Sequence, residues 1–441
     1  MRSLARLSAF AVVSFHLVSA LHADVRHVAP SGQPFTEIQA AIDASSAGDV
    51  VVVHPGTYAG FMVDGKALTV CADGVGASAV AAVTGETVVS NLASGRVVLS
   101  GLQLTGPSAQ CPDQPGALGL RIVGNAGFVL VQSCTVRGGL SSGAGYLYQP
   151  PACASGVSAM LLQDNVGGVV LSDLQVSGTT AAWAYHPFGG CCFYSQYYAP
   201  SAPGAVVISS RLALMDSVLV GGAGAGAAEG GPGSEGLQLH STVPGRGAFV
   251  MGSTVRGGPG GPGFEDTLMY PGGNGGTGVQ VTGLARMHLF SSTIAGGNGG
   301  PACCSGYPGG LSGVPVGGLG LEHGYSGQHL QIRAPSVVHP GQSVTFEARG
   351  TPGVVVRLFA STDARFFHVP SWRGVLVPGV PAVDDGMTMG VIPASGVLSV
   401  SYLVPALASG VSSRHLFVQA YRTDPSGGYA LSNARCVTVV P

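Results

Sequence analysis

The stretch I-Q-A-A-I-D (38–43), followed by G-D-V-V-V-V-H-P-G-T-Y (48–58), decides the fold. In its first part, apolar or small residues recur with the period of one helical face, at Ile38, Ala41, Ile42 and Ser45. Thr36 and Gln39 have the spacing of a capping box, in which two side chains satisfy backbone N–H groups at the start of a helix. The sequence therefore predicts a short helix over 36–46, with a strand directly after it.

From this strand to about residue 325 the chain repeats itself loosely. One recurring element is a short strand that ends in glycine, and it occupies 101–106, 133–139, 172–178, 216–222, 252–258 and 291–297. A second element opens each unit, starting at Gly119, Gly156, Gly204, Gly236 and Gly278. Apolar and polar residues alternate in these elements with a period of two, which is typical of strands. The repeat predicts an all-β fold, a right-handed single-stranded parallel β-helix.

The variation in unit length falls in the loops 107–116, 139–155, 179–203, 222–235, 257–277 and 297–317. Because these loops leave each coil at an equivalent place, we expect them to cluster on one side of the solenoid. The open end of a solenoid exposes a sheet edge that needs a cover. The helix over 36–46 is placed to cap the first coil.

The two ends of the chain differ from this repeat. Two arginines, a short apolar run and small residues predict a signal peptide over 1–23, so we expect export to the extracellular space or cell surface. The β-helix is then expected over 24–328 and a small C-terminal β-sandwich over 329–441. The sandwich strands are predicted at 330–333, 343–348, 354–360, 397–403, 416–421 and 436–440.

Charge is scarce in this sequence. Only 9% of residues are charged, the net charge is −2, and Lys66 is the single lysine. Nothing here makes the basic face that nucleic acid or an anionic membrane requires, and no later apolar run is long enough to span a bilayer. The glycine-rich loops lack the lysine of a phosphate-binding loop and the regular aspartates of calcium-binding repeats. No cofactor is therefore identified, calcium stays an open alternative without a supporting motif, and the sequence does not specify an oligomeric state.

Nine cysteines are present, and export permits disulfides. Cys71, Cys134 and Cys436 lie in apolar, strand-like runs and are predicted to be buried free thiols. The other six lie in loops and are disulfide candidates: Cys111, Cys153, Cys191, Cys192, Cys303 and Cys304. Their pairing is left open. A metal site made by the two Cys-Cys pairs and His186 is a weaker alternative, because no ligand spacing typical of zinc accompanies them.

The opening segment 38–58 resembles the N-terminal cap and first coil of pectin-lyase-like proteins. That superfamily includes polysaccharide lyases, hydrolases, methylesterases and epimerases, along with members of no known activity. The resemblance implies the fold, and it implies an activity only where catalytic motifs carry over. The polygalacturonase motifs, the methylesterase segment and the calcium-binding carboxylate cluster of lyases are all absent. No catalytic set carries over.

Two aspartates nevertheless occupy equivalent positions. Asp173 and Asp216 lie five residues before the glycines that end successive coil strands, so they are expected to stack about 5 Å apart. A close carboxylate pair suits general acid–base catalysis. The alternative is that the column is a turn, since Ser133, Gly252 and Ser291 occupy it in other coils.

A second candidate surface follows the opening strands. Outward positions there are predicted for Arg121, Ser158, Gln238, Gln280 and Glu322, with His240 and Thr282 two residues later. In pectin-lyase-like enzymes the substrate groove lies along such a strand face. The resemblance thus implies that Gln238, Gln280 and Glu322 bind sugar hydroxyls, with His240 as a base. An ordinary solvated strand face is the alternative reading.

The loop from Trp183 to Tyr198 is rich in aromatic residues and holds one of the chain's two tryptophans. Aromatic faces stack on sugar rings, so Trp183, Tyr185 and His186 are candidate ligand-binding residues. Packing of a long loop against itself would use the same residues. Two functions follow from the sequence. The favoured one is a non-enzymatic glycan-binding or cell-surface protein, and the other is an enzyme acting on uronan-type polysaccharides, a lyase, hydrolase or epimerase.

Overall fold

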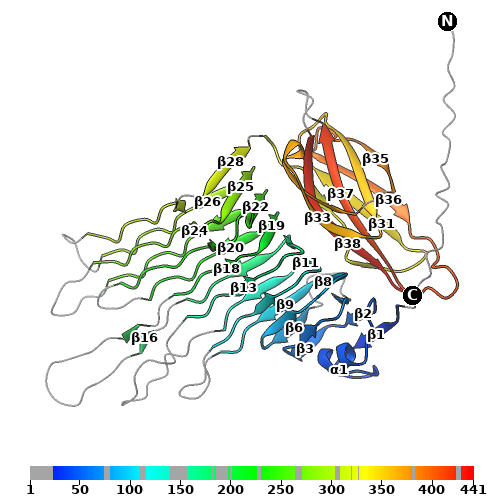
Figure 1. Ribbon diagram of the computed structural model, residues 1–441, viewed down its shortest axis with the longest axis horizontal. Helices are drawn as coiled ribbons and strands as arrows, with labels where there is room; N and C mark the ends of the chain where they lie inside the picture. The colour runs from blue at the N-terminus through cyan, green and yellow to red at the C-terminus, as the bar shows by residue number, and fades with distance from the viewer. Residues whose placement is uncertain are drawn as a thin grey trace, which may run out of the picture.

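The computed structural model describes residues 23–73, 80–108, 116–139, 156–180, 183–184, 197–198, 201–225, 230–263, 271–302, 308–318, 320–325, 327–379, 383–423 and 429–441. Within them the protein is a parallel β-helix whose coils stack from the N-terminal end, with a β-sandwich beside it (Figure 1). The predicted fold class is confirmed.

Three parallel sheets form the β-helix. In spatial order, the ten-stranded sheet contains β1 (Val25–Val28), β2 (Val50–Val53), β5 (Thr69–Ala72), β8 (Arg96–Ser100), β11 (Phe128–Gln132), β14 (Val169–Ser172), β19 (Arg211–Met215), β22 (Gly247–Met251), β25 (Arg286–Phe290) and β28 (Leu321–Tyr325). One eight-stranded sheet contains β3 (Gly56–Ala59), β6 (Ala81–Thr84), β9 (Leu102–Thr105), β12 (Thr135–Arg137), β15 (Gln175–Ser177), β20 (Val218–Val220), β23 (Thr254–Arg256) and β26 (Thr293–Ala295). The other contains β4 (Met62–Asp64), β7 (Thr87–Ser90), β10 (Leu120–Val123), β13 (Met160–Gln163), β18 (Ala205–Ile208), β21 (Leu237–Ser241), β24 (Val279–Gly283) and β27 (Val316–Gly317).

The predicted repeat maps onto the two eight-stranded sheets. The glycine-ended elements are the strands of the sheet from β9 to β26, and the opening elements are the strands from β10 to β24. Each of the six predicted loops leaves after the first kind of strand and returns before the second. The described parts of the loops, among them 221–225, 257–263 and 271–278, therefore lie on one flank, as expected, and Figure 1 shows these coloured segments running side by side.

The helix α1 (Ile38–Asp43) covers the first coil, and Ile38, Ala41 and Ile42 belong to the core of the β-helix. The predicted capping box is wrong. Glu37 is the N-cap residue, and no side chain caps the helix. Gln39 instead exchanges hydrogen bonds with the backbone of Met62, because its amide faces the next strand of the coil rather than the start of the helix.

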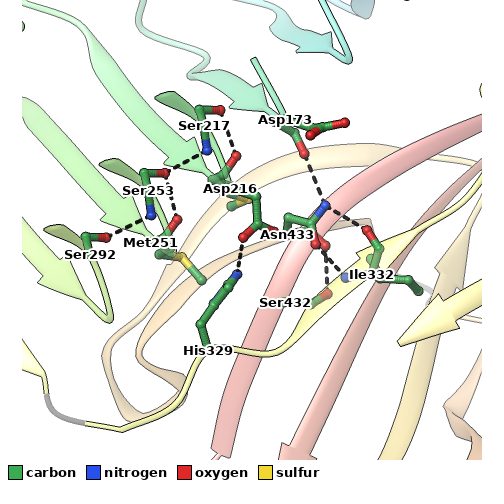
Figure 2. A network of polar contacts seen from close by, with 12 residues as sticks. Asp173, Asp216, Ser217, Met251, Ser253, Ser292, His329, Ile332, Ser432 and Asn433 are labelled. Carbon is green, nitrogen blue, oxygen red and sulfur yellow. Dashed lines mark hydrogen bonds and ion pairs between the residues drawn. The ribbon is translucent and has the colours of Figure 1, made fainter. Parts of the chain in front are cut away.

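Polar ladders hold the turns of successive coils in register. The buried Asn125 donates from Nδ2 to Oδ1 of the buried Asn165, 2.8 Å away, and Asn165 in turn donates to Ser210 Oγ. At another turn the backbone N–H of Ser217 donates to Ser253 Oγ, and that of Ser253 donates to Ser292 Oγ (Figure 2). These ladders satisfy polar groups that would otherwise be buried without partners.

The C-terminal strands form antiparallel sheets around a separate apolar cluster. One sheet contains β29 (Gln331–Arg333), β31 (Ser343–Arg349) and β36 (Val397–Leu403). The second contains β30 (Val337–Val338), β38 (Tyr429–Val439), β37 (Arg414–Thr423), β32 (Val355–Ser361) and β35 (Val383–Val391), with β30 parallel to β38. A hairpin of β33 (Ala364–Val369) and β34 (Gly374–Pro378) encloses the 3-10 turn η1 (Pro370–Trp372). All six predicted sandwich strands are present.

The middle strands of the ten-stranded sheet, β8 to β19, are buried on both faces except at Arg96 and Arg211, the first residues of β8 and β19. Their inward side chains join the β-helix core, and their outward side chains, among them Leu130, Val170 and Met215, pack against the sandwich. Strand β38 crosses the outer face of several coils. The side-chain amide of Gln132 bonds both the N–H and the C=O of Cys436 at 2.8 Å, and Ser172 Oγ donates to the carbonyl of Ala434.

His415 lies in this contact and sets a pH dependence. It is buried in β37, with its ring nitrogens near Thr69 Oγ1 and Thr438 Oγ1. Burial, and after it the charge of Arg96, lowers the pKa of His415 to about 3 from an ordinary value of 6.5. Between these values the unfolded chain binds a proton that the folded chain does not. The folded state is therefore unaffected by this group above about pH 6.5 and loses stability as the pH falls toward 3.

We expect His415→Gln to remove much of this acid sensitivity. Urea unfolding at pH 7 and pH 4 should show a stability loss in the wild type that exceeds the loss in the variant by about 3 kcal/mol. The exposed His240, changed to Gln, is the matched control and should behave as the wild type. Equal losses in the wild type and His415→Gln would mean that His415 is not held neutral.

Candidate functional site

The column that contains Asp173 and Asp216 is a left-handed turn. The two aspartates have φ angles of 58° and 49°, and Ser133, Gly252 and Ser291 have φ angles between 48° and 56° at the same place in other coils. The N–H of Asp173 bonds the carbonyl of Met215, the residue before Asp216. The sequence thus aligned the coils correctly here, and the alternative reading of the column as a turn is confirmed.

Asp216 faces the C-terminal region rather than an open groove. Its Oδ1 lies 2.8 Å from Nε2 of His329, and the two side chains are only 5% and 10% exposed (Figure 2). In the next coil the equivalent residue is Gly252, and a Cβ there would lie 2.3 Å from the His329 ring. Glycine at this position gives the imidazole room to reach the carboxylate.

Asp173 pairs with Arg435 of β38. The guanidinium Nη2 lies 2.9 Å from Asp173 Oδ2, and Nη1 donates to Ser133 Oγ at 2.7 Å. The Arg435 side chain is 3% exposed, whereas that of Asp173 is 41% exposed. Each candidate carboxylate thus contacts a side chain from the C-terminal region, Arg435 or His329, and helps to fix that region to the β-helix.

The second candidate surface is only partly assembled. Gln238 and Gln280 are paired neighbours on β21 and β24, and the exposed His240 places Nδ1 3.0 Å from Thr282 Oγ1. Gln238 also donates to Glu235. Glu322 was wrongly placed in this column, because it lies on β28 of the ten-stranded sheet.

Ser158 was also placed wrongly. Leu161 is the neighbour of Arg121, so the element from Gly156 enters the sheet three residues later than its sequence motif suggested. The apolar–polar pattern that follows Gly156 looks like the start of a strand, but β13 begins only at Met160.

The glycine-rich loops form an ordered layer that sequence reasoning missed. We call six segments the glycine arms: the outgoing arms 221–225, 257–263 and 296–302, and the returning arms 230–236, 271–278 and 308–315. Backbone hydrogen bonds cross between outgoing and returning arms at positions three residues apart. Gly258 donates to Ser234 and Gly261 to Gly231, and the same spacing recurs through the stack.

Backbone hydrogen bonds also join arms of the same kind, outgoing to outgoing and returning to returning. Gly260 donates to the carbonyl of Asn298 on the next outgoing arm, and Gly275 donates to that of Leu311 on the next returning arm. A three-residue period with bonds to several neighbouring chains is the arrangement that glycine-rich extended helices allow. The arms are therefore a hydrogen-bonded body in which each arm bonds to more than one neighbouring arm.

Close packing explains the glycines of the arms. A Cβ on Gly261 would lie 1.8 Å from the carbonyl oxygen of Ala225, and one on Gly273 would lie 2.1 Å from that of Gly231. The third position of the period carries the larger side chains, and those that are exposed include Pro259, Pro262, Asn274, Asn298, Pro301 and Leu311. The sequence feature that could have predicted the arms is the G-G-x repeat in 257–262, 272–277 and 296–301, which has the same three-residue period.

Among the aromatic candidates, Trp183 is placed only by its backbone. It pairs with Tyr198 in a short antiparallel hairpin, β16 (Trp183–Ala184) and β17 (Tyr197–Tyr198), which lies out along the loop flank in Figure 1. Tyr185 and His186 lie outside the described residues. So do all six disulfide candidates, Cys111, Cys153, Cys191, Cys192, Cys303 and Cys304.

Cys71 of β5, Cys134 in the turn between β11 and β12, and Cys436 of β38 are buried free thiols, as predicted. Burial raises the pKa of both Cys134 and Cys436 to about 12, and it raises the pKa of Cys71 further still. Thiolate, the reactive form, is therefore negligible at neutral pH. These residues contribute packing rather than nucleophilic chemistry.

No family model matches the chain, and no curated protein matches it. In the described part of the chain, no three His, Cys, Asp or Glu side chains gather as a metal-binding group. The helices of that part include none that is long and apolar enough to cross a membrane.

We expect Gly261→Ala to loosen the glycine arms, because its methyl group would overlap the Ala225 carbonyl. Hydrogen exchange in peptides from 221–236 and 257–263 should accelerate, with a local stability loss of about 2 kcal/mol or more. Pro259→Ala, at an outward position of the same arm, is the control and should leave exchange in the returning arms unchanged. Equal protection in Gly261→Ala and the wild type would contradict close packing of the arms.

We expect Asp173 and Arg435 to be energetically coupled. Asp173→Asn leaves a buried guanidinium without its anion, so a double-mutant cycle with Arg435→Gln should give a coupling of about 1 kcal/mol or more. The exposed pair Glu347 and Arg349, 3.1 Å apart, is the control and should give less than about 0.5 kcal/mol. Coupling no larger than that of the control would remove the interface role of Asp173.

Proposed function

We propose that this is an exported, non-catalytic protein that binds carbohydrate at or near a cell surface. In this proposal the glycine arms and the aromatic loop 183–198 carry the binding surface. The single observation that supports it most is the hydrogen-bonded body of arms on one flank of the solenoid. Such a body holds outward side chains in fixed rows, which reduces the entropy cost of binding an extended chain.

The placement of the two aspartates supports the same proposal. Asp216 contacts His329 and Asp173 pairs with Arg435, so each carboxylate already has a side-chain partner from the C-terminal region. The outer face of the ten-stranded sheet is covered by the sandwich and offers no strand face for a polymer. A binding role for the loops requires neither the two aspartates nor the outer face of this sheet.

The second candidate is a polysaccharide-active enzyme of the pectin-lyase-like kind. One observation favours it: the exposed His240 imidazole is oriented by Thr282, beside Gln238 and Gln280 on an outer strand face. An oriented histidine on such a surface suits a general base. The two candidate functions can be distinguished by assaying product formation as well as binding.

The mature chain should be screened on a glycan array, and bound polyuronates should be assayed for new reducing ends and for absorbance at 235 nm. We expect binding without turnover. Trp183→Ala should weaken binding about fivefold or more, because an aromatic stack on a sugar ring contributes on the order of 1 kcal/mol or more. Phe367→Ala, an exposed aromatic on β33, should leave binding unchanged.

Product formation that is lost in His240→Ala would replace the proposed function with the enzymatic one. Silence on the array, or binding indifferent to Trp183→Ala, would remove the aromatic loop as the site.

A further inference from the structure

A cavity of about 290 Å³ lies between the β-helix and the hairpin β33–β34. The starts of β19, β22 and β25 supply one side of it, and Phe366 and His368 of β33 supply the other. Gly245, Gly247 and Ala248 leave its floor without large side chains. A Cβ on Gly247 would lie 2.0 Å from the carbonyl oxygen of Arg286, so this part of the floor cannot carry a side chain in the present backbone.

Positive charge converges on the cavity. Arg211, Arg246 and Arg286 line it, and no carboxylate is among the lining residues, all of which the structure describes. The Arg211 guanidinium lies over the Phe366 ring, 4.9 Å from the centroid. Burial, and after it the charge of Arg246, lowers the pKa of Arg211. The charges of Arg211 and Arg246 are close enough to act on each other, and an anion bound beside both would offset this repulsion.

Rings form a second wall. His288 stacks on Phe249 with centroids 4.4 Å apart, and His368 tilts against Phe249 at 4.0 Å. The Nε2 atom of His368 is buried and has no hydrogen-bond partner within the described part of the chain. Because a buried polar atom without a partner is costly, it marks a place where a ligand atom would be stabilising.

We propose that this cavity binds a small oxyanion, a phosphate, sulfate or carboxylate group, either free or carried on a sugar. The guanidinium groups of Arg211 and Arg246 supply paired N–H donors that match oxyanion geometry, and His368 Nε2 supplies a further polar contact. The volume lies near the lower limit of ligand pockets, about 300 Å³, which suits an oxyanion together with part of a sugar that carries it. This site is separate from the glycine arms and does not rest on the proposed function.

The test is isothermal titration calorimetry of the whole mature chain at constant ionic strength, with chloride as the balancing anion. The probes are inorganic phosphate, inorganic sulfate, glucuronate and glucose 6-phosphate. We expect saturable binding of one equivalent by at least one of them. Arg246→Gln should weaken it tenfold or more, and Arg211→Gln should do the same, whereas Arg256→Gln, an exposed arginine of β23, should not.

The probes also separate the two sources of the oxyanion. Equal affinity for phosphate and glucose 6-phosphate would assign a free oxyanion, and tighter binding of either sugar would assign a ring on the aromatic wall. Thermal unfolding gives a second readout. Sulfate stabilises most proteins by exclusion from their surface, but only a bound ion gives a saturable rise that Arg246→Gln removes. No saturable binding of any probe, or binding equal in Arg246→Gln and the wild type, would overturn the proposal.

Discussion

The middle strands of the ten-stranded sheet, β8 to β19, are buried on both faces, and much of the molecule is arranged around that property. A solenoid can bury only the inner face of a sheet by stacking coils, so the outer face of this one requires a second layer. The β-sandwich supplies it. Once β38 lies across the coils, the remaining polar groups at the contact must be paired, and Gln132, Asp173 and Asp216 each meet a partner from the C-terminal region.

The sequence predicted the fold class through alternation, and alternation is also the reason that it did not single out this sheet. Strands with one wet face, such as Leu237–Ser241, show a period of two. Strands such as Phe128–Gln132 and Val169–Ser172 are buried throughout and read as unbroken apolar runs. Those runs were the available sign that a further layer covers the solenoid. The capping-box prediction was wrong because the side-chain amide of Gln39 bonds the backbone of Met62 on β4, a contact that no local sequence pattern shows.

The candidate site was predictable only where it depends on the local repeat. The offset from glycine aligned Asp173 with Asp216, because each coil turns at the same left-handed position. The partners of these residues, Arg435 and His329, come from distant parts of the sequence, and no local pattern links them. The cavity between β22 and β33 likewise joins arginines and rings that are adjacent only after the two layers meet.

The three-residue period of the glycine arms also governs how their length can change during evolution. Adding one residue to an arm would move a bulky side chain to a position where only hydrogen fits, as at Gly261. Adding three residues to both the outgoing and the returning arm would restore every contact. The hydrogen-bonded arms, as distinct from the connections between them, are therefore expected to lengthen in matched triplets, with variation at the outward third positions. In the arms, the three-residue spacing of the glycines is fixed by packing, whereas the residue type at the outward positions is not.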